Sequence, residues 1–152
     1  MDRIVVSLGG SVLVPDDQDS VHLRQLAALV RSLSSDYSFV LVCGGGKVAR
    51  YYIAQARQLS GNRDEQDELG IAVTRLNARL LKLAIGSKAA EAIPHTVEDA
   101  ATTLANGKVV VMGGTSPGHT TDAVAAMVAE AVGAKRIVNA TSVDAAYTAD
   151  PK

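Results

Sequence analysis

The chain has 152 residues, of which 47% are hydrophobic and 20% charged, and its formal net charge is -1 from 15 basic and 16 acidic side chains. This balance is typical of one soluble globular domain, and it lacks the basic excess of nucleic-acid-binding proteins. No signal peptide and no apolar run near the roughly 20 residues of a membrane span is visible, so we expect a cytoplasmic location, and the single cysteine excludes an internal disulfide.

Short β-branched runs alternate with longer helical stretches in the first half of the chain. Residues 4–8 predict a strand, and a helix with an apolar face follows up to Leu33. Residues 39–42 predict a second strand, and Cys43, which follows it in the same apolar run, is expected to be buried. The next helix begins near Lys47 and ends at Gly61. The polar stretch 60–66 predicts a surface loop.

The second half continues the alternation. A long helix is expected over about residues 65–85, with a buried stripe at Leu69, Val73, Leu76, Leu80 and Ala84. Residues 109–112 predict a strand, Thr121 is expected to cap a nearly all-apolar helix over residues 122–132, and residues 136–138 predict the last strand. The pattern predicts an α/β fold over residues 1–152, a three-layer αβα sandwich with a mainly parallel open sheet.

Three of the predicted strands run directly into glycine clusters, at residues 9–10, 44–46 and 113–114. In a parallel sheet these clusters share one edge, where open α/β sheets bind ligands. Glycine lets an anion approach backbone N–H groups without a Cβ in the way, and helix N-termini add partial positive charge. The three clusters together predict a site for a ligand with several phosphates.

The second cluster also admits another interpretation. It does not fit a Walker A loop, because Val48 follows Lys47 where that loop needs Ser or Thr. It does fit the dinucleotide-binding pattern with a final alanine, and Asp67 lies about 20 residues further on, as a ribose contact would. That pattern normally follows the first strand of its unit and leaves the other clusters unexplained. A dinucleotide-binding fragment therefore stays open as an alternative.

Five motifs lie in order along the chain, at residues 7–11, 44–50, 67–77, 113–122 and 141–151. The first two resemble the glycine loops of the amino-acid-kinase family. The third resembles the acceptor-binding helix of its uridylate (UMP) kinases, including Thr74, Arg75 and Asn77. The fourth closely resembles the acceptor loop of the archaeal UMP kinases, and the fifth resembles the family's nucleotide-base loop.

The resemblance implies transfer of the γ-phosphoryl group of ATP to UMP, giving UDP and ADP, with Mg²⁺. It implies that the ATP phosphates are held by Gly10, Ser11, Gly46 and Arg50. It implies that the adenosine is held by Thr141, Tyr147 and Asp150. It implies that UMP is held by Gly45, Asp67, Thr115, Ser116, Pro117, Gly118, His119, Thr120 and Thr121. Helix capping alone would explain one of the two adjacent threonines.

Two further residues are candidates for catalysis. Many members of the family have a lysine where this chain has Ser7, although the archaeal UMP kinases also tend to lack it. Lys47, Arg50 or a residue beyond position 152 would then supply the cation. The alternative interpretation of Lys47 and Arg50 is a solvated surface side chain. Asp122, in a first helical turn, either helps to orient the phosphates or is an acid that the helix dipole favours.

The resemblance also bears on the extent and assembly of the chain. Family members continue beyond the motif at residues 150–151, so we expect a C-terminally truncated chain that lacks the ATP-side part of the fold. UMP kinases of this type usually assemble as hexamers, which implies a homo-oligomer. Two alternatives remain, namely a sister enzyme with another acceptor and a non-catalytic nucleotide-binding remnant.

Overall fold

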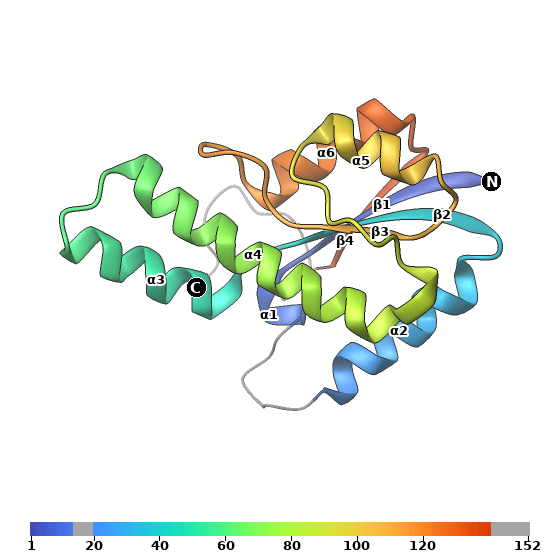
Figure 1. Cartoon of the computed structure of the whole chain (residues 1–152), viewed down its shortest axis with the longest axis horizontal. Helices are drawn as coiled ribbons and strands as arrows, with labels where there is room; N and C mark the ends of the chain where they lie inside the picture. Colours follow the sequence, from blue (N-terminus) through green and yellow to red (C-terminus); the bar gives the residue numbers. More distant parts are fainter. Residues whose placement is uncertain (14–19, 141–152) are drawn as a thin grey trace.

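The computed structural model describes residues 1–13 and 20–140 of the chain. Its four strands form one parallel sheet in the order β3-β2-β1-β4 (Figure 1). The strands are β1 (Asp2–Leu8), β2 (Tyr37–Cys43), β3 (Val110–Met112) and β4 (Arg136–Ala140). The helices are α1 (Gly10–Leu13), α2 (Val21–Leu33), α3 (Gly46–Gln58), α4 (Arg63–Ile85), the 3₁₀ turn η1 (Gly86–Lys88), α5 (Val97–Leu104) and α6 (Thr121–Val132).

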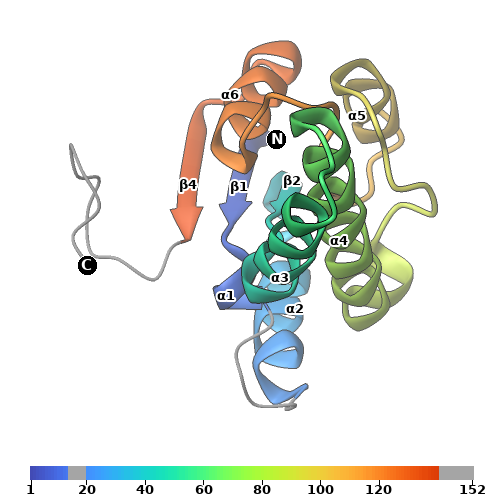
Figure 2. The same cartoon turned by 90° about the vertical axis from the view of Figure 1, so that its left-hand side faces the viewer.

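Helices cover both faces of this sheet. Helices α2 and α4 lie on one face, and α5 and α6 lie on the other (Figure 2). Helix α3 packs against α4 beyond the carboxyl ends of the strands. The predicted α/β sandwich with a parallel sheet is confirmed. None of the described helices is both long and apolar enough to cross a membrane.

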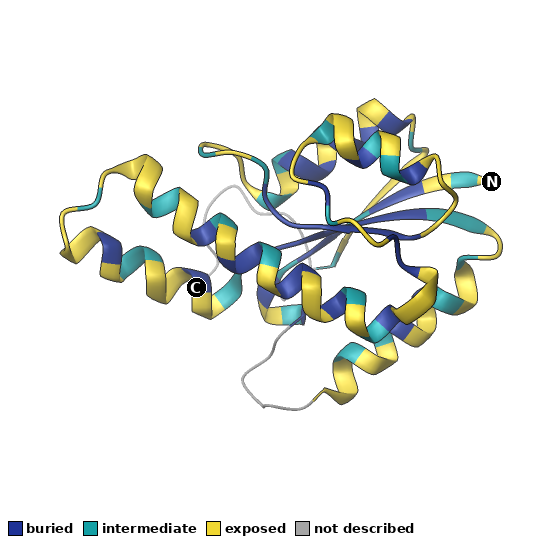
Figure 3. Cartoon of the chain, in the orientation of Figure 1, coloured by how far each residue is buried: buried dark blue, intermediate teal, exposed yellow. Residues whose placement is uncertain are grey.

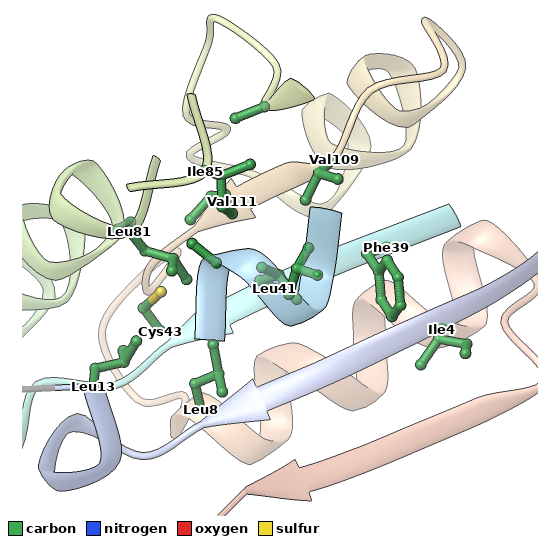
Figure 4. Close-up of a cluster of buried hydrophobic side chains, with 14 residues drawn as sticks. Ile4, Leu8, Leu13, Phe39, Leu41, Cys43, Leu81, Ile85, Val109 and Val111 are labelled. Atoms are coloured by element: carbon green, nitrogen blue, oxygen red, sulfur yellow. The ribbon is translucent and has the colours of Figure 1, made fainter. Parts of the chain in front are cut away.

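Side chains alternate in direction along the strands, so that one hydrophobic cluster forms on each face of the sheet. In β2, Phe39, Leu41 and Cys43 point into the cluster beneath α2 and α4 (Figure 4), because successive strand residues face opposite sides. Val40 and Val42 point into the cluster beneath α5 and α6. Cys43 is fully buried as predicted, and desolvation raises the pKa of its thiol well above the usual range.

The connection between α3 and α4 is shorter than the sequence suggests. Helix α4 begins at Arg63, inside the stretch 60–66 that we expected to be a loop. Asn62 and Glu65 form a capping box: Glu65 N donates to Asn62 Oδ1 at 2.8 Å, and Asn62 N donates to Glu65 Oε1 at 2.9 Å. This reciprocal pair satisfies two donors at the helix start, so the polar residues there begin a helix rather than a loop.

The predicted buried stripe of α4 is wrong for three of its leucines. Leu69, Leu76 and Leu80 are 39%, 59% and 45% exposed, and the helix alternates between buried and exposed residues along its length (Figure 3). The buried face is made by Gly70, Val73, Thr74, Asn77, Ala78, Leu81 and Ile85. Its two polar side chains reduce its apparent hydrophobicity, so the neighbouring leucine row gave the stronger sequence pattern.

Helix α6 is apolar and buried where the sequence predicts it, at Val124, Ala125, Val128, Ala129 and Val132. Its cap is not Thr121 but Thr120, whose Oγ1 accepts a hydrogen bond from Ala123 N at 3.1 Å. Thr121 is instead the first helical residue. The helix ends at Gly133, which adopts φ +63° as expected of a C-terminal glycine.

Candidate functional site

The three glycine clusters lie together at the carboxyl edge of the sheet, as predicted. The first two are in direct backbone contact, since a Cβ placed on Gly10 would lie 2.0 Å from Gly46 N. Gly44 N also donates to Leu8 O at 2.8 Å, which joins the ends of β1 and β2. Gly46 adopts φ +65°, a conformation that residues with a Cβ rarely take. Only glycine allows these two loops to approach so closely.

Two cavities open at this edge. The first has a volume of about 620 Å³ and lies between α4 and the loop after β3, which we call the 113–121 loop. The second has a volume of about 320 Å³ and lies over the first two glycine clusters. Thr120 and Thr121 line both cavities. The two cavities therefore adjoin at the start of α6.

Helix α4 holds the 113–121 loop in place through two charged side chains. Asp67 Oδ2 accepts a hydrogen bond from Gly118 N at 2.9 Å. Arg75 donates from Nε to Gly114 O at 3.3 Å and from a terminal nitrogen to Thr115 O at 3.2 Å. These bonds fix both ends of the loop segment that forms one wall of the first cavity.

Two polar side chains on the buried face of α4 reach the backbone of the glycine loops. Thr74 Oγ1 accepts from Gly114 N at 2.8 Å and donates to Ile71 O at 2.6 Å. Asn77 Nδ2 donates to Gly44 O at 2.8 Å. Both side chains are 8% exposed. One face of α4 thus contacts the loops after β2 and after β3.

The second cavity contains a buried hydroxyl bonded to a carboxylate. Ser7 is 2% exposed, and its Oγ donates to Asp122 Oδ1 at 2.7 Å. Ser7 lies near the end of β1 and Asp122 in the first turn of α6, so the bond joins the sheet to the helix start. The carboxylate also lies where the helix dipole favours negative charge.

The structure brings most of the predicted site residues together. The second cavity is lined by the predicted donor-phosphate residues Gly10, Ser11, Gly46 and Arg50, together with Gly45 and Asp122. The first cavity is lined by six of the predicted acceptor residues, Asp67, Ser116, Gly118, His119, Thr120 and Thr121. Thr115 and Pro117 belong to the same loop without being part of either lining.

Other predicted residues are placed differently or are not described. Lys47 is exposed in the first turn of α3, and the described linings of the two cavities do not include it. Thr141, Tyr147 and Asp150 lie outside the described residues.

Positive charge at the second cavity comes from backbone as well as side chains. Two helix N-termini line this cavity, that of α3 at Gly46 and that of α6 at Thr121. Arg50 also lines it, one turn into α3. Such helix starts present N–H donors and a partial positive charge, which favours phosphate. Within residues 1–13 and 20–140, no group of three or more His, Cys, Asp or Glu side chains could hold a metal ion.

The sequence interpretation missed the roles of three residues. Thr74 and Asn77 lie in the motif at residues 67–77, which predicts no part for them in the site, and the sequence marks Ser7 only as the position of a family lysine. The available signal was a polar pair three residues apart in a helix that must bury one face, because buried polar groups need hydrogen-bond partners.

The fold and site define a class of protein: a parallel α/β protein whose glycine loops and helix starts surround adjoining cavities suited to phosphates. The chain belongs to the amino acid kinase family, whose model matches residues 2–152.

Two curated relatives are uridylate kinases. That of Haloquadratum walsbyi is 49% identical over 150 residues, which are 98% of this chain and 62% of the relative. That of Methanobrevibacter smithii is 43% identical over 149 residues, 98% of this chain and 66% of the relative. The chain therefore spans about two thirds of the length of these relatives.

A solved structure supports the same grouping. The crystal structure of uridylate kinase from Archaeoglobus fulgidus superposes with a TM-score of 0.89 at 47% identity, covering 100% of this chain and 69% of that one.

Proposed function

We propose that this chain binds UMP and ATP and belongs to a nucleoside-monophosphate kinase that transfers the γ-phosphoryl group of ATP to UMP. The observation that carries the proposal is the pair of cavities that adjoin at Thr120 and Thr121. In-line phosphoryl transfer needs the acceptor phosphate and the donor phosphates in one continuous space, held with their reacting oxygens aligned. The names of the relatives support uridylate as the acceptor.

The first cavity is proposed to hold UMP. Asp67 and the 113–121 loop line it, and their hydrogen-bonding groups suit a sugar and a phosphate. Gly118 and His119 lie in the part of the loop that Asp67 fastens to α4. With Thr115, Ser116 and Pro117 they form the proposed acceptor loop. Gly45, the remaining proposed UMP contact, lines the second cavity rather than the first.

The second cavity is proposed to hold the phosphates of ATP. Gly10, Ser11 and Gly46 line this cavity at the starts of α1 and α3, and Arg50 supplies a guanidinium that can pair with phosphate oxygens. The adenosine contacts at Thr141, Tyr147 and Asp150 remain a proposal from the resemblance alone.

Asp122 is the proposed carboxylate at the point of transfer. Mg²⁺ usually binds through one or two carboxylates together with substrate phosphates, and Asp122 is the carboxylate that the described residues bring to the second cavity. When bound, Mg²⁺ would neutralise charge on the phosphates. Lys47 is the proposed additional cation, on the first turn of α3.

An acceptor panel tests the proposal. The chain is incubated with ATP, Mg²⁺ and, separately, UMP, CMP, AMP or aspartate, and nucleoside diphosphate formation is followed by chromatography. We expect UDP from UMP and at least about tenfold less product from the other acceptors, the discrimination that one or two specific contacts give. Equal rates with all acceptors would contradict UMP specificity. Saturable UMP binding without turnover would leave a nucleotide-binding protein, the second candidate, supported by Ser7 at the usual lysine position.

A further inference from the structure

The buried face of α4 carries two polar side chains where an apolar core would be expected. Thr74 and Asn77 are three residues apart, so they lie on one face of the helix. Thr74 contacts the loop after β3, and Asn77 contacts the loop after β2. Neither side chain favours the helix itself, because threonine and asparagine are less favourable helix formers than leucine or alanine.

Thr74 is hydrogen-bonded to the loop after β3, and its methyl group lies on the side of the loop after β2. Its hydroxyl accepts the hydrogen bond from Gly114 N, and a Cβ on Gly113 would lie 2.5 Å from the same Oγ1. Its methyl group faces the second loop, since a Cβ on Gly45 would lie 3.6 Å from Thr74 Cγ2. Thr74 therefore lies between the backbone of the second glycine cluster and the backbone of the third, and Ala49 borders the second cluster beside it.

Asn77 fixes the orientation of two peptide groups. Its Nδ2 lies 2.8 Å from Gly44 O and 3.4 Å from Gly45 O, so both carbonyls turn toward α4. In a trans peptide the C=O and the following N–H point in opposite directions. The N–H groups of Gly45 and Gly46 therefore point away from α4, and Gly46 N lies on the side of Gly10. That is the side of the second cavity.

We propose that Thr74 and Asn77 are positioning residues that fasten the acceptor loop and the phosphate loop to one rigid helix, and thereby set the span between the two nucleotides. The inference rests on the proposed function. Neither residue needs to touch the reacting atoms. Thr74 lines the first cavity itself and also holds the wall of that cavity through Gly114. Asn77 lines neither of the two cavities and acts through Gly44 and Gly45 on the phosphate side.

A matched pair of substitutions tests the role of Thr74. Thr74→Val keeps the shape but removes the hydroxyl, which leaves the buried Gly114 N–H without its acceptor. Thr74→Ser keeps the hydroxyl. We expect Thr74→Val to weaken UMP binding, measured by calorimetry, by about tenfold, because a Gly114 that is no longer held must be ordered when UMP binds. Thr74→Ser should stay within about threefold of the unaltered chain, and ATP affinity should change little in either variant.

Thermal denaturation of the same proteins separates positioning from folding. A merely structural role predicts that Thr74→Val lowers the melting temperature while UMP affinity per folded molecule stays unchanged, which would overturn the inference. Equal losses of affinity in Thr74→Val and Thr74→Ser would also overturn it. Failure of the unaltered chain to bind UMP would instead contradict the proposed function, and the inference with it.

Asn77→Asp provides an independent test on the phosphate side. The carboxylate has the same shape, but it cannot donate to Gly44 O and it repels both carbonyls. We expect this variant to weaken ATP binding by about tenfold or more while UMP affinity changes less. The opposite order of effects, or none in a folded protein, would contradict the assignment of Asn77 to the phosphate loop.

Discussion

Ser7 donates a 2.7 Å hydrogen bond to Asp122 across the junction of β1 and α6. The hydroxyl is buried and the carboxylate lies at the exposed start of a helix, so the bond holds the carboxylate over the second cavity. At position 7 the chain has a short neutral donor. A hydrogen bond from a neutral side chain therefore orients Asp122.

Removing the Ser7 hydroxyl should affect activity more than stability. Ser7→Ala deletes one hydrogen bond to a carboxylate that water can still reach, so the free energy of unfolding should fall by about 1 kcal/mol. If Asp122 needs this orientation, turnover with ATP and UMP should fall by about tenfold or more, because misplaced groups lose transition-state interactions.

Asp122→Asn in the same assay should lower turnover at least as far as Ser7→Ala. Glu130→Gln, a charge change near the other end of α6, serves as the control and should leave the rate unchanged. Full activity in both site variants would show that the Ser7–Asp122 pair has only a structural role.

The close approach of the first two loops predicts a sharp difference between neighbouring glycines. A Cβ on Gly10 would lie 2.0 Å from Gly46 N, whereas a Cβ on Gly9 would meet nothing nearer than Ala140 O at 3.5 Å. Gly10→Ala should therefore destabilise the chain by roughly 3 kcal/mol or more, as severe overpacking does. Gly9→Ala should cost less than about 1 kcal/mol. Urea denaturation measures both, and similar values would contradict the loop geometry.

The orientation of α4 can be tested with two adjacent leucines. Leu81 is fully buried, whereas Leu80 is 45% exposed. Leu81→Ala should lower the free energy of unfolding by about 2–5 kcal/mol, and Leu80→Ala by much less. The reverse order in denaturant titrations would mean that the leucine stripe predicted from the sequence is the buried face. Thr74 and Asn77 would then not face the glycine loops.

Burial of Cys43 predicts a specific pH dependence of stability. Its pKa is raised by desolvation from an ordinary value of 9.0, so the thiol stays protonated in the folded chain while it ionises in the unfolded one. Stability is therefore retained below pH 9 and lost above it, at up to about 1.4 kcal/mol per pH unit.

Replacing the thiol should abolish this contribution. Cys43→Ala should show a shallower decline of the free energy of unfolding between pH 9 and 10.5, measured by urea denaturation beside the unaltered chain. Parallel curves for the two proteins would mean that Cys43 ionises freely in the folded state.

The sequence predicts the helices and strands and the ligand-binding edge of the sheet well, but it does not predict which face of every helix is buried. Strand β2 and helix α6 are recognisable because their apolar residues are continuous, and the glycine clusters follow the strands directly. The buried face of α4 is harder to predict, because Thr74 and Asn77 are buried there only by virtue of hydrogen bonds to loops about 30 to 40 positions away. Likewise, nothing local to Ser7 indicates that Asp122, 115 residues further on, is its partner.

The account depends most on the two adjoining cavities holding acceptor and donor together. The most direct measurement is calorimetric titration with a bisubstrate analogue in which adenosine and uridine are joined by a pentaphosphate. Because such a ligand occupies both cavities through one linker, we predict an affinity at least about a hundredfold above that of UMP alone, and competition with both UMP and ATP. An affinity equal to that of UMP, with no displacement by ATP, would contradict a shared cleft.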